Sequence, residues 1–253
     1  MAIGLFVIGD EILSGKRQDK HVTKVIDLLA ARGLPLAWVQ MLGDDEDRIA
    51  AAIRATHAQG EVVLSCGGIG ATPDDRTRQA AAKAFELPLV RHPQGEALIV
   101  NEYGEKAFPN RVLMADFVQG AGLIPNPVNR VAGFFLHDHN FVPGFPEMAW
   151  PMLEWVLDTR YRPLHNPDPP VEFSLRAIGS SSEGDLLQLM EQTLADFPGV
   201  SLSSLPFRGS GTQPRHIEFG IKGPRALAAR AFDSLRLGLL AHGEIRIEDL
   251  LAP

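Results

Sequence analysis

The chain has 253 residues, of which 45% are hydrophobic and 22% are charged, and its formal net charge is −7. Such a composition is typical of a globular protein with one large core or two smaller ones. The negative charge disfavours nucleic acid as the main partner, and no apolar run approaches the roughly 20 residues that a membrane span requires. The single cysteine excludes an internal disulfide, so we expect a cytoplasmic protein without a membrane partner.

The first third of the chain alternates strand and helix patterns. Apolar runs of strand length span Ile3–Ile8, Leu36–Met41 and Val62–Cys66. Apolar residues recur at helical spacing around Val25 and Ile53, and an alanine-rich helix is expected from Thr77 to Phe85. This alternation predicts an α/β fold with a mostly parallel sheet flanked by helices. Ligands of such sheets bind beyond the carboxyl ends of the strands.

The middle of the chain is less regular. A helix is expected over Glu96–Tyr103, whereas the stretch 109–122 shows no pattern that can be assigned. Two strands, Val131–Leu136 and Phe141–Val142, should be joined by a polar turn. A further helix is expected from Pro146 onward, because apolar residues again recur at helical spacing.

A proline-rich stretch, Arg162–Pro170, predicts a linker, because its four prolines disfavour both a helix and a central strand. It would separate a first domain at 1–162 from a second at 171–253. The expected order in the second domain is strand, helix, strand, strand, helix and strand, over Val171–Ile178, Glu183–Ala195, Val200–Phe207, His216–Ile221, Pro224–Leu239 and Glu244–Ile247. This order is typical of a small α+β, ferredoxin-like domain.

A glycine-rich turn, with Gly67, Gly68 and Gly70, lies between a buried strand and a helix. Glycines at this place let backbone amides approach a phosphate without interference from a Cβ atom. The pattern is neither a Walker loop nor a dinucleotide fingerprint. A tight strand-to-helix turn would explain two of the three glycines, so the local pattern leaves anion binding and a plain turn equally open.

Acidic residues follow all three of the early strands. The groups are Asp10 with Glu11, Asp44 with Asp45, and Asp74 with Asp75. Helix capping could explain single members of each group, and it is the preferred interpretation of Glu46 and Asp47. Carboxylates beside a phosphate would repel it unless a divalent cation bridged the two, as Mg²⁺ commonly does. Three such groups therefore indicate a metal or a polar ligand, and we expect the metal on Asp75, Asp74 and Asp44, with Asp45 and Glu11 as further catalytic candidates.

Two other features favour structural interpretations. His137-Asp138-His139 has a spacing that a metal could use, but its place in an expected hairpin favours a solvated turn. Cys66 ends a buried strand and has no identifiable partner base, so a small buried hydrophobe is the better interpretation.

Four segments in order resemble the molybdopterin-binding domain, most closely the version in the competence/damage-inducible protein A (CinA) family. The four segments are Gly9-Asp10-Glu11-Ile12-Leu13-Ser14-Gly15-Lys16, Gly43-Asp44-Asp45, Gly67-Gly68-Ile69-Gly70-Ala71-Thr72-Pro73-Asp74-Asp75-Arg76-Thr77 and Pro143-Gly144-Phe145-Pro146-Glu147-Met148. The resemblance covers roughly residues 1–160. It implies ligand contacts at Asp10, Ser14, Lys16, Gly67, Gly68, Gly70 and Thr72.

The resemblance implies two activities that share this site. One is metal-dependent hydrolysis of ADP-ribose at its pyrophosphate, and the other is binding and adenylylation of molybdopterin, with essential aspartates at Asp44 or Asp45 and at Asp75. This chain departs from the family at Ala71, at Asp19-Lys20-His21 and at Asn129-Arg130-Val131-Ala132-Gly133. A catalytically silent module that binds a small phosphorylated ligand therefore stays open. By analogy with the fold, we expect a homo-oligomer.

Overall fold

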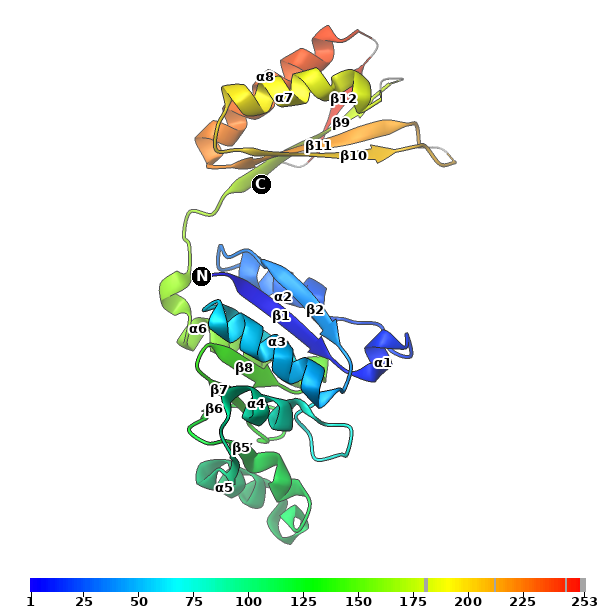
Figure 1. Cartoon of the computed structure of the whole chain (residues 1–253). Coiled ribbons are helices and arrows are strands. Elements are labelled where there is room, and N and C mark those ends of the chain that lie inside the picture. The colour runs from blue at the N-terminus through cyan, green and yellow to red at the C-terminus, as the bar shows by residue number, and fades with distance from the viewer. Residues whose placement is uncertain (180–181, 212, 244, 251–253) are drawn as a thin grey trace. The chain divides into compact units, whose positions relative to one another are not determined.

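The computed structural model describes residues 1–179, 182–211, 213–243 and 245–250. The chain divides into two compact units, Met1–Pro167 and Asp168–Pro253 (Figure 1). No helix within the described residues combines the length and the apolar character needed to cross a membrane.

The first unit is built on a six-stranded sheet in the order β2-β1-β3-β8-β7-β6. Its strands are β1 (Ile3–Ile8), β2 (Trp38–Leu42), β3 (Val62–Cys66), β6 (Gly122–Ile124), β7 (Gly133–Leu136) and β8 (His139–Val142). The first four in the sheet order pair in parallel, and β7 and β6 add an antiparallel edge. The predicted mostly parallel α/β sheet is confirmed.

Helices cover both faces of this sheet. On one face lie α2 (His21–Ala30) and α6 (Pro146–Thr159), and on the other lie α3 (Glu46–Ala58) and α4 (Thr77–Phe85) (Figure 1). Successive residues of β1 therefore enter opposite cores: Val7 packs with α2 and α6, whereas Phe6 packs with α3 and α4. This double burial explains why β1 and β3, which are buried along their whole length, are nearly continuous apolar runs rather than alternating ones.

The helix predicted over Glu96–Tyr103 is confirmed, and it belongs to a run of mostly short elements that includes part of the unassigned stretch 109–122. They are β4 (Leu89–Arg91), α5 (Pro93–Tyr103), the 3-10 helices η1 (Gly104–Ala107) and η2 (Arg111–Ala115), and β5 (Asp116–Val118). Strands β4 and β5 pair as a separate antiparallel ribbon. Most of these elements have three to five residues, which is too short to establish a periodicity. Two further differences are a short helix α1 (Asp10–Leu13) after β1 and a 3-10 helix η3 (Arg162–Leu164) where the proline-rich linker had excluded a helix.

The second unit is a four-stranded antiparallel sheet in the order β10-β11-β9-β12. Its elements are β9 (Val171–Ile178), η4 (Gly184–Leu186), α7 (Leu187–Asp196), β10 (Ser201–Phe207), β11 (His216–Gly223), α8 (Arg225–Ala241) and β12 (Arg246–Asp249). Residues of both helices pack with the strands in one core. The predicted ferredoxin-like order is confirmed, although Glu244, the predicted start of the last strand, lies outside the described residues.

Candidate functional site

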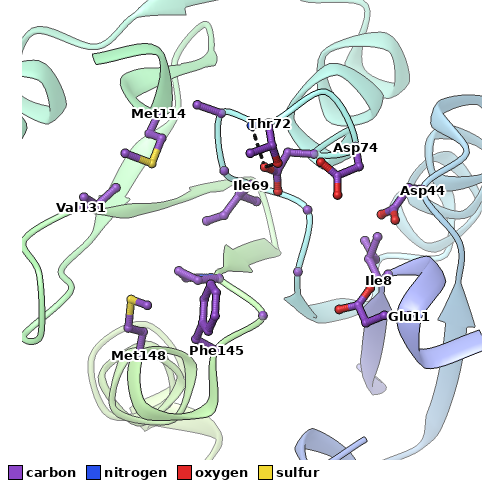
Figure 2. A pocket seen from close by; sticks show the side chains of 18 of the residues that line it. Ile8, Glu11, Asp44, Ile69, Thr72, Asp74, Met114, Val131, Phe145 and Met148 are labelled. Atoms are coloured by element: carbon purple, nitrogen blue, oxygen red, sulfur yellow. Dashed lines mark hydrogen bonds between the residues drawn. The ribbon is translucent and has the colours of Figure 1, made fainter. Parts of the chain in front are cut away.

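A pocket of about 560 Å³ lies at the carboxyl edge of the parallel strands (Figure 2). The segments that follow β1, β2, β3 and β8 all contribute to it, since parallel strands end at one edge of the sheet. Gly9, Asp44, Gly67 and Pro143 mark these four segments. The structure therefore places the three acidic turns, the third of which contains the glycines, at one edge of the sheet, as expected.

Thr77, the first residue of α4, holds the glycine turn in place. Its hydroxyl donates to the Gly67 carbonyl and its amide donates to the Gly68 carbonyl, both at 2.9 Å. In a trans peptide the carbonyl and the next amide point in opposite directions. The amides of Gly68 and Ile69 therefore point away from Thr77, and among the described residues they donate to no protein acceptor. Free, oriented amides of this kind form an anion-binding nest.

Gly67 differs from the expectation that it presents its amide to a ligand. Its amide donates to the Val142 carbonyl of β8 at 3.0 Å, so it extends the sheet pairing. A Cβ atom at this position would lie 2.1 Å from the Ile8 carbonyl oxygen. Gly67 thus serves the close approach of three strand ends, whereas the amides of Gly68 and Ile69 have no protein acceptor among the described residues.

Asp75 closes the far end of the turn. Its Oδ2 atom accepts from the Thr72 amide at 2.9 Å and from the Thr72 hydroxyl at 2.5 Å. The carboxylate lies against Gly70, where a Cβ atom would come within 2.4 Å of Oδ2. The other oxygen, Oδ1, accepts no hydrogen bond from the described residues, so it remains available to a ligand or a cation.

Asp44 and Asp45 have different roles in the structure. Asp45 is the N-cap of α3, where its side chain accepts from the Arg48 amide at 2.9 Å, and it does not line the pocket. Asp44 does line the pocket, and its Oδ2 atom accepts from the Asp10 amide at 3.0 Å. Burial raises the pKa of Asp44 most, and the neighbouring carboxylates raise it further, against the hydrogen bond from Asp10. The net shift shows that a negative charge on Asp44 is disfavoured in the folded protein.

Of the predicted site residues, eight line the pocket and four do not. Those that line it are Glu11, Asp44, Gly67, Gly68, Gly70, Thr72, Asp74 and Asp75. Asp10, Ser14, Lys16 and Asp45 lie outside it. Asp10 still supports the site through its bonds to Asp44, and the Ser14 hydroxyl donates to the Glu11 carbonyl at 3.4 Å.

The carboxylates of this edge fit a cation only with help from a ligand. Within the described part of the chain, no three acidic, histidine or cysteine side chains are grouped closely enough to hold a metal ion. Mg²⁺ is usually bound by one or two carboxylates together with substrate phosphates and water. Asp44 and Asp75 are suited to that arrangement, because both line the pocket into which the free amides of the turn open.

The side chains of Glu11, Asp44 and Asp74 form an acidic wall of the pocket, and an apolar wall faces it across the glycine turn (Figure 2). Its side chains are those of Ile69, Met114, Val131, Phe145 and Met148. The wall could not be predicted from the sequence, because Met114 belongs to the unassigned stretch and the others come from three separate segments. Such a surface suits a flat ring system, as thioether and aromatic groups pack well against one.

Two asparagines and an arginine complete the lining. Asn126 donates through Nδ2 to Asn129 Oδ1 at 2.8 Å, and the Val131 amide donates to the same oxygen at 3.1 Å. These bonds leave the Asn129 amide nitrogen as a donor at the pocket. Arg17 follows α1 and adds a positive charge there. Neither Asn126 nor Arg17 lies in a predicted motif, so no signal in the sequence identified them.

A structural interpretation was preferred for Cys66 and for the segment of His139, and it is correct only for Cys66. Cys66 is buried, which raises the pKa of its thiol, so the buried-hydrophobe interpretation is confirmed. The solvated turn was wrong for His139, which belongs to β8 and is fully buried. Its Nε2 atom lies 2.8 Å from the Thr56 hydroxyl. Burial, followed by the charges of His57 and His137, lowers the pKa of His139 to about 4.

Comparison with known proteins agrees with this geometry. A CinA-like protein of Gloeobacter violaceus is 34% identical over 132 residues, which cover 51% of this chain and 31% of that protein. An Escherichia coli (strain K12) protein named NMN amidohydrolase-like protein YfaY is 31% identical over 220 residues, covering 81% of this chain and 54% of that protein. The chain thus spans about half the length of its relatives or less.

A solved structure of CinA from Thermoplasma acidophilum, described as having unknown function, superimposes with a TM-score of 0.57 at 26% identity. The match covers 62% of this chain and 98% of that one. Residues 4–163 match a family described as a probable molybdopterin binding domain. Because this match covers more than half of the chain, the chain belongs to the family of probable molybdopterin-binding domains.

Proposed function

We propose that this protein is a divalent-metal-dependent hydrolase of a nucleotide-like pyrophosphate, with ADP-ribose as the representative substrate. One observation carries the proposal: the free amides of the glycine turn lie between an acidic wall and an apolar wall of the same pocket. A nucleoside diphosphate derivative has the matching parts, which are a ring, a pyrophosphate and an affinity for Mg²⁺.

Each wall would have its own task. The amides of Gly68 and Ile69 would hold one phosphate, and the apolar wall would hold the ring. Asp44 and the free oxygen of Asp75 would hold Mg²⁺, which neutralises charge between phosphate and carboxylates and lowers the pKa of water. Glu11 or Asp74 would orient the attacking water and accept its proton, since both line the pocket.

The reaction balances without another reactant. The water oxygen forms a bond to one phosphorus of the pyrophosphate, and the bond from that phosphorus to the bridging oxygen breaks. The bridging oxygen leaves with the other phosphate, and the water proton passes to a carboxylate. ADP-ribose and water would give AMP and ribose 5-phosphate.

The test is to incubate the full chain with ADP-ribose and Mg²⁺ or Co²⁺ and to measure AMP by chromatography. Asp44→Asn should lower turnover at least about 100-fold, as removal of one group that stabilises transition-state charge commonly does. The control is Asp47→Asn, the same change on an exposed residue that pairs with Lys83. No AMP from the wild type, or equal activity in both variants, would reject the proposal. AMP transfer to molybdopterin in its place would identify the adenylylation activity, and binding without turnover would identify a silent module.

A further inference from the structure

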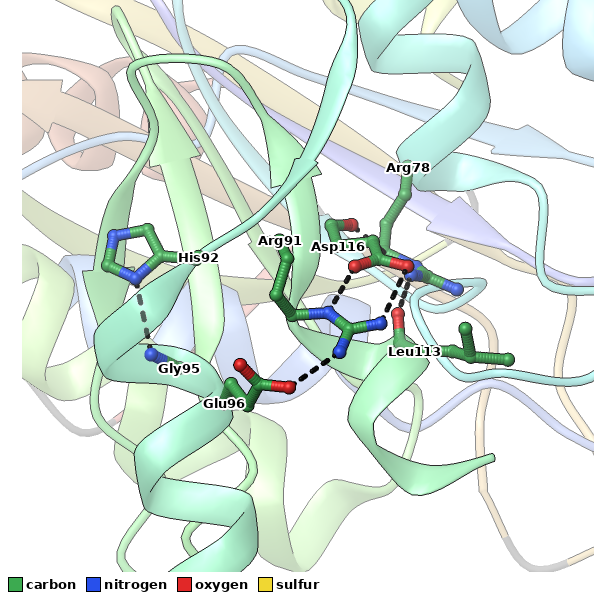
Figure 3. A network of polar contacts seen from close by, with 7 residues as sticks. All are labelled: Arg78, Arg91, His92, Gly95, Glu96, Leu113 and Asp116. Carbon is green, nitrogen blue, oxygen red and sulfur yellow. Dashed lines mark hydrogen bonds and ion pairs between the residues drawn. The ribbon is translucent and has the colours of Figure 1, made fainter. Parts of the chain in front are cut away.

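Arg78 connects the glycine turn to the segment 113–116, which carries part of the apolar wall. Figure 3 shows Arg78 beside Leu113 and Asp116 of that segment. It is the second residue of α4 and is only 5% exposed. One terminal nitrogen donates to the Gly70 carbonyl at 2.5 Å. The other donates to the Leu113 carbonyl and, at 3.2 Å, to the Asp116 carbonyl. A single buried guanidinium thus holds main-chain oxygens on both sides of Met114 and at the end of the turn.

The charge of Arg78 is not used in an ion pair. Among the described residues, no carboxylate lies within salt-bridge distance of it. The nearby Asp116 carboxylate pairs instead with Arg91, whose Nε atom lies 2.5 Å from Oδ1. Arg91 also pairs with Glu96 at 2.7 Å. The hydrogen bonds that the guanidinium donates within the described residues therefore all go to main-chain carbonyls, and they fix the positions of these carbonyls.

The carbonyl that Arg78 holds determines where the next amide points. The Gly70–Ala71 peptide is trans, so a Gly70 carbonyl directed at Arg78 turns the Ala71 amide to the opposite side. Ala71 lines the pocket, and its amide donates to no acceptor among the described residues. Thr77 does the same for the amides of Gly68 and Ile69, as described above. Arg78 therefore orients the Ala71 amide, which the hydrogen bonds of Thr77 do not fix.

We propose that Arg78 is a positioning residue that orients the Ala71 amide toward a ligand phosphate and fixes Met114 in the apolar wall. It would thereby select ligands that present a phosphate and a ring together, such as nucleotides, over ligands with either part alone. This inference rests on the proposed function only in placing a phosphate at the glycine turn. It does not require that the phosphate be hydrolysed.

The binding test compares Arg78→Lys with Arg91→Gln in the full chain. Lysine keeps the charge but cannot span the carbonyls of two segments, because it lacks the planar fork of arginine. Arg91→Gln breaks the ion pairs of the same segment without touching the glycine turn. By calorimetry with AMP and Mg²⁺, Arg78→Lys should weaken binding about tenfold, as expected for loss of a charged hydrogen bond, and Arg91→Gln less than about twofold. Equal weakening would show that Arg78 merely stabilises the fold, and unchanged or absent AMP binding would also overturn the proposal.

A second readout needs no ligand. In amide NMR spectra, Arg78→Lys should move the Ala71 signal more than that of Gly68, whose preceding carbonyl Thr77 holds. Arg91→Gln should move neither. Equal movement of the Ala71 signal in the two variants would contradict a role at the turn. If the wild type binds AMP but fails to hydrolyse ADP-ribose, the hydrolase proposal is rejected while the role of Arg78 stands.

Discussion

Asp10 and Asp44 exchange hydrogen bonds across the ends of two neighbouring strands. The Asp10 amide donates to Asp44 Oδ2 at 3.0 Å, and the Asp44 amide donates to Asp10 Oδ1 at 3.2 Å. Each carboxylate therefore accepts a hydrogen bond from the backbone amide of the other residue, although both carboxylates carry negative charge. The arrangement keeps Asp44 at the pocket and assigns Asp10 a supporting position behind it.

Asp44→Asn should stabilise the protein at neutral pH. Because the pKa of Asp44 is raised in the folded state, ionisation of its carboxylate opposes folding. This cost is absent below the ordinary aspartate pKa of about 3.9 and is complete above the raised folded-state pKa. Asparagine can still accept from the Asp10 amide. Urea unfolding should give a gain of less than about 1 kcal/mol at pH 7, since Asp44 is only partly buried, and the gain should shrink toward pH 4. A gain that grows as the pH falls would contradict this assignment.

Thr77→Val should destabilise the protein and weaken phosphate binding together. The side chain of Thr77 is fully buried, and valine has its shape without the hydroxyl that holds the Gly67 carbonyl. An unsatisfied buried acceptor costs about 1–3 kcal/mol. Urea unfolding and calorimetry with AMP measure the two effects. Thr77→Ser keeps the hydroxyl, so it should recover most of the AMP affinity; if it does not, the hydroxyl is not what orients the turn.

Gly68→Ala should be more damaging than Gly60→Ala. Both residues have a left-handed backbone, with φ values of 68° and 66°, so each substitution carries a backbone cost of about 1–2 kcal/mol. A Cβ atom at Gly60 meets nothing within 4 Å, whereas one at Gly68 would lie 2.3 Å from the Thr77 hydroxyl oxygen. The difference between the free energies of unfolding of the two variants therefore measures the cost of this clash. AMP affinity should fall only in the Gly68 variant, and a fall in both would point to a loss of global stability.

Acid should destabilise the fold through His139. The pKa of this side chain is lowered from 6.5 to about 4 in the folded state. Between these two pH values the imidazole is therefore protonated in the unfolded chain but not in the folded one. The stabilisation is complete above pH 6.5 and is lost as the pH falls toward 4, with a slope of up to about 1.4 kcal/mol per pH unit. Urea unfolding between pH 6.5 and 4.5 should show this slope, and His139→Gln should reduce it. An unchanged slope in the variant would place the effect on another group.

The sequence predicted most of the strands and helices that depend on local, periodic patterns of residues. The buried strands β1 and β3, the helix α4 and the order of the second unit follow from runs and spacings that a reader can count. The convergence of acidic turns on one edge follows as well, because parallel strands leave no other place for them.

Features that depend on pairing between distant segments could not be predicted. Asp44 and Asp45 are neighbours of one type, and only the start of α3 decides that the second caps the helix while the first faces the pocket. The Gly67 amide is consumed by Val142, which is a consequence of β3 pairing with β8. The contacts of Arg78 reach 35 residues along the chain to Leu113, and no local pattern signals that distance.

The separate cores of the two units have an evolutionary consequence. Every member of the core around Phe219 belongs to the second unit, and the cores around Val7 and Phe6 lie wholly in the first. A gene rearrangement that joined or removed the second unit after Pro167 would interrupt no core of the first. The segment 1–167 therefore carries all the described residues of the cores that its own elements form.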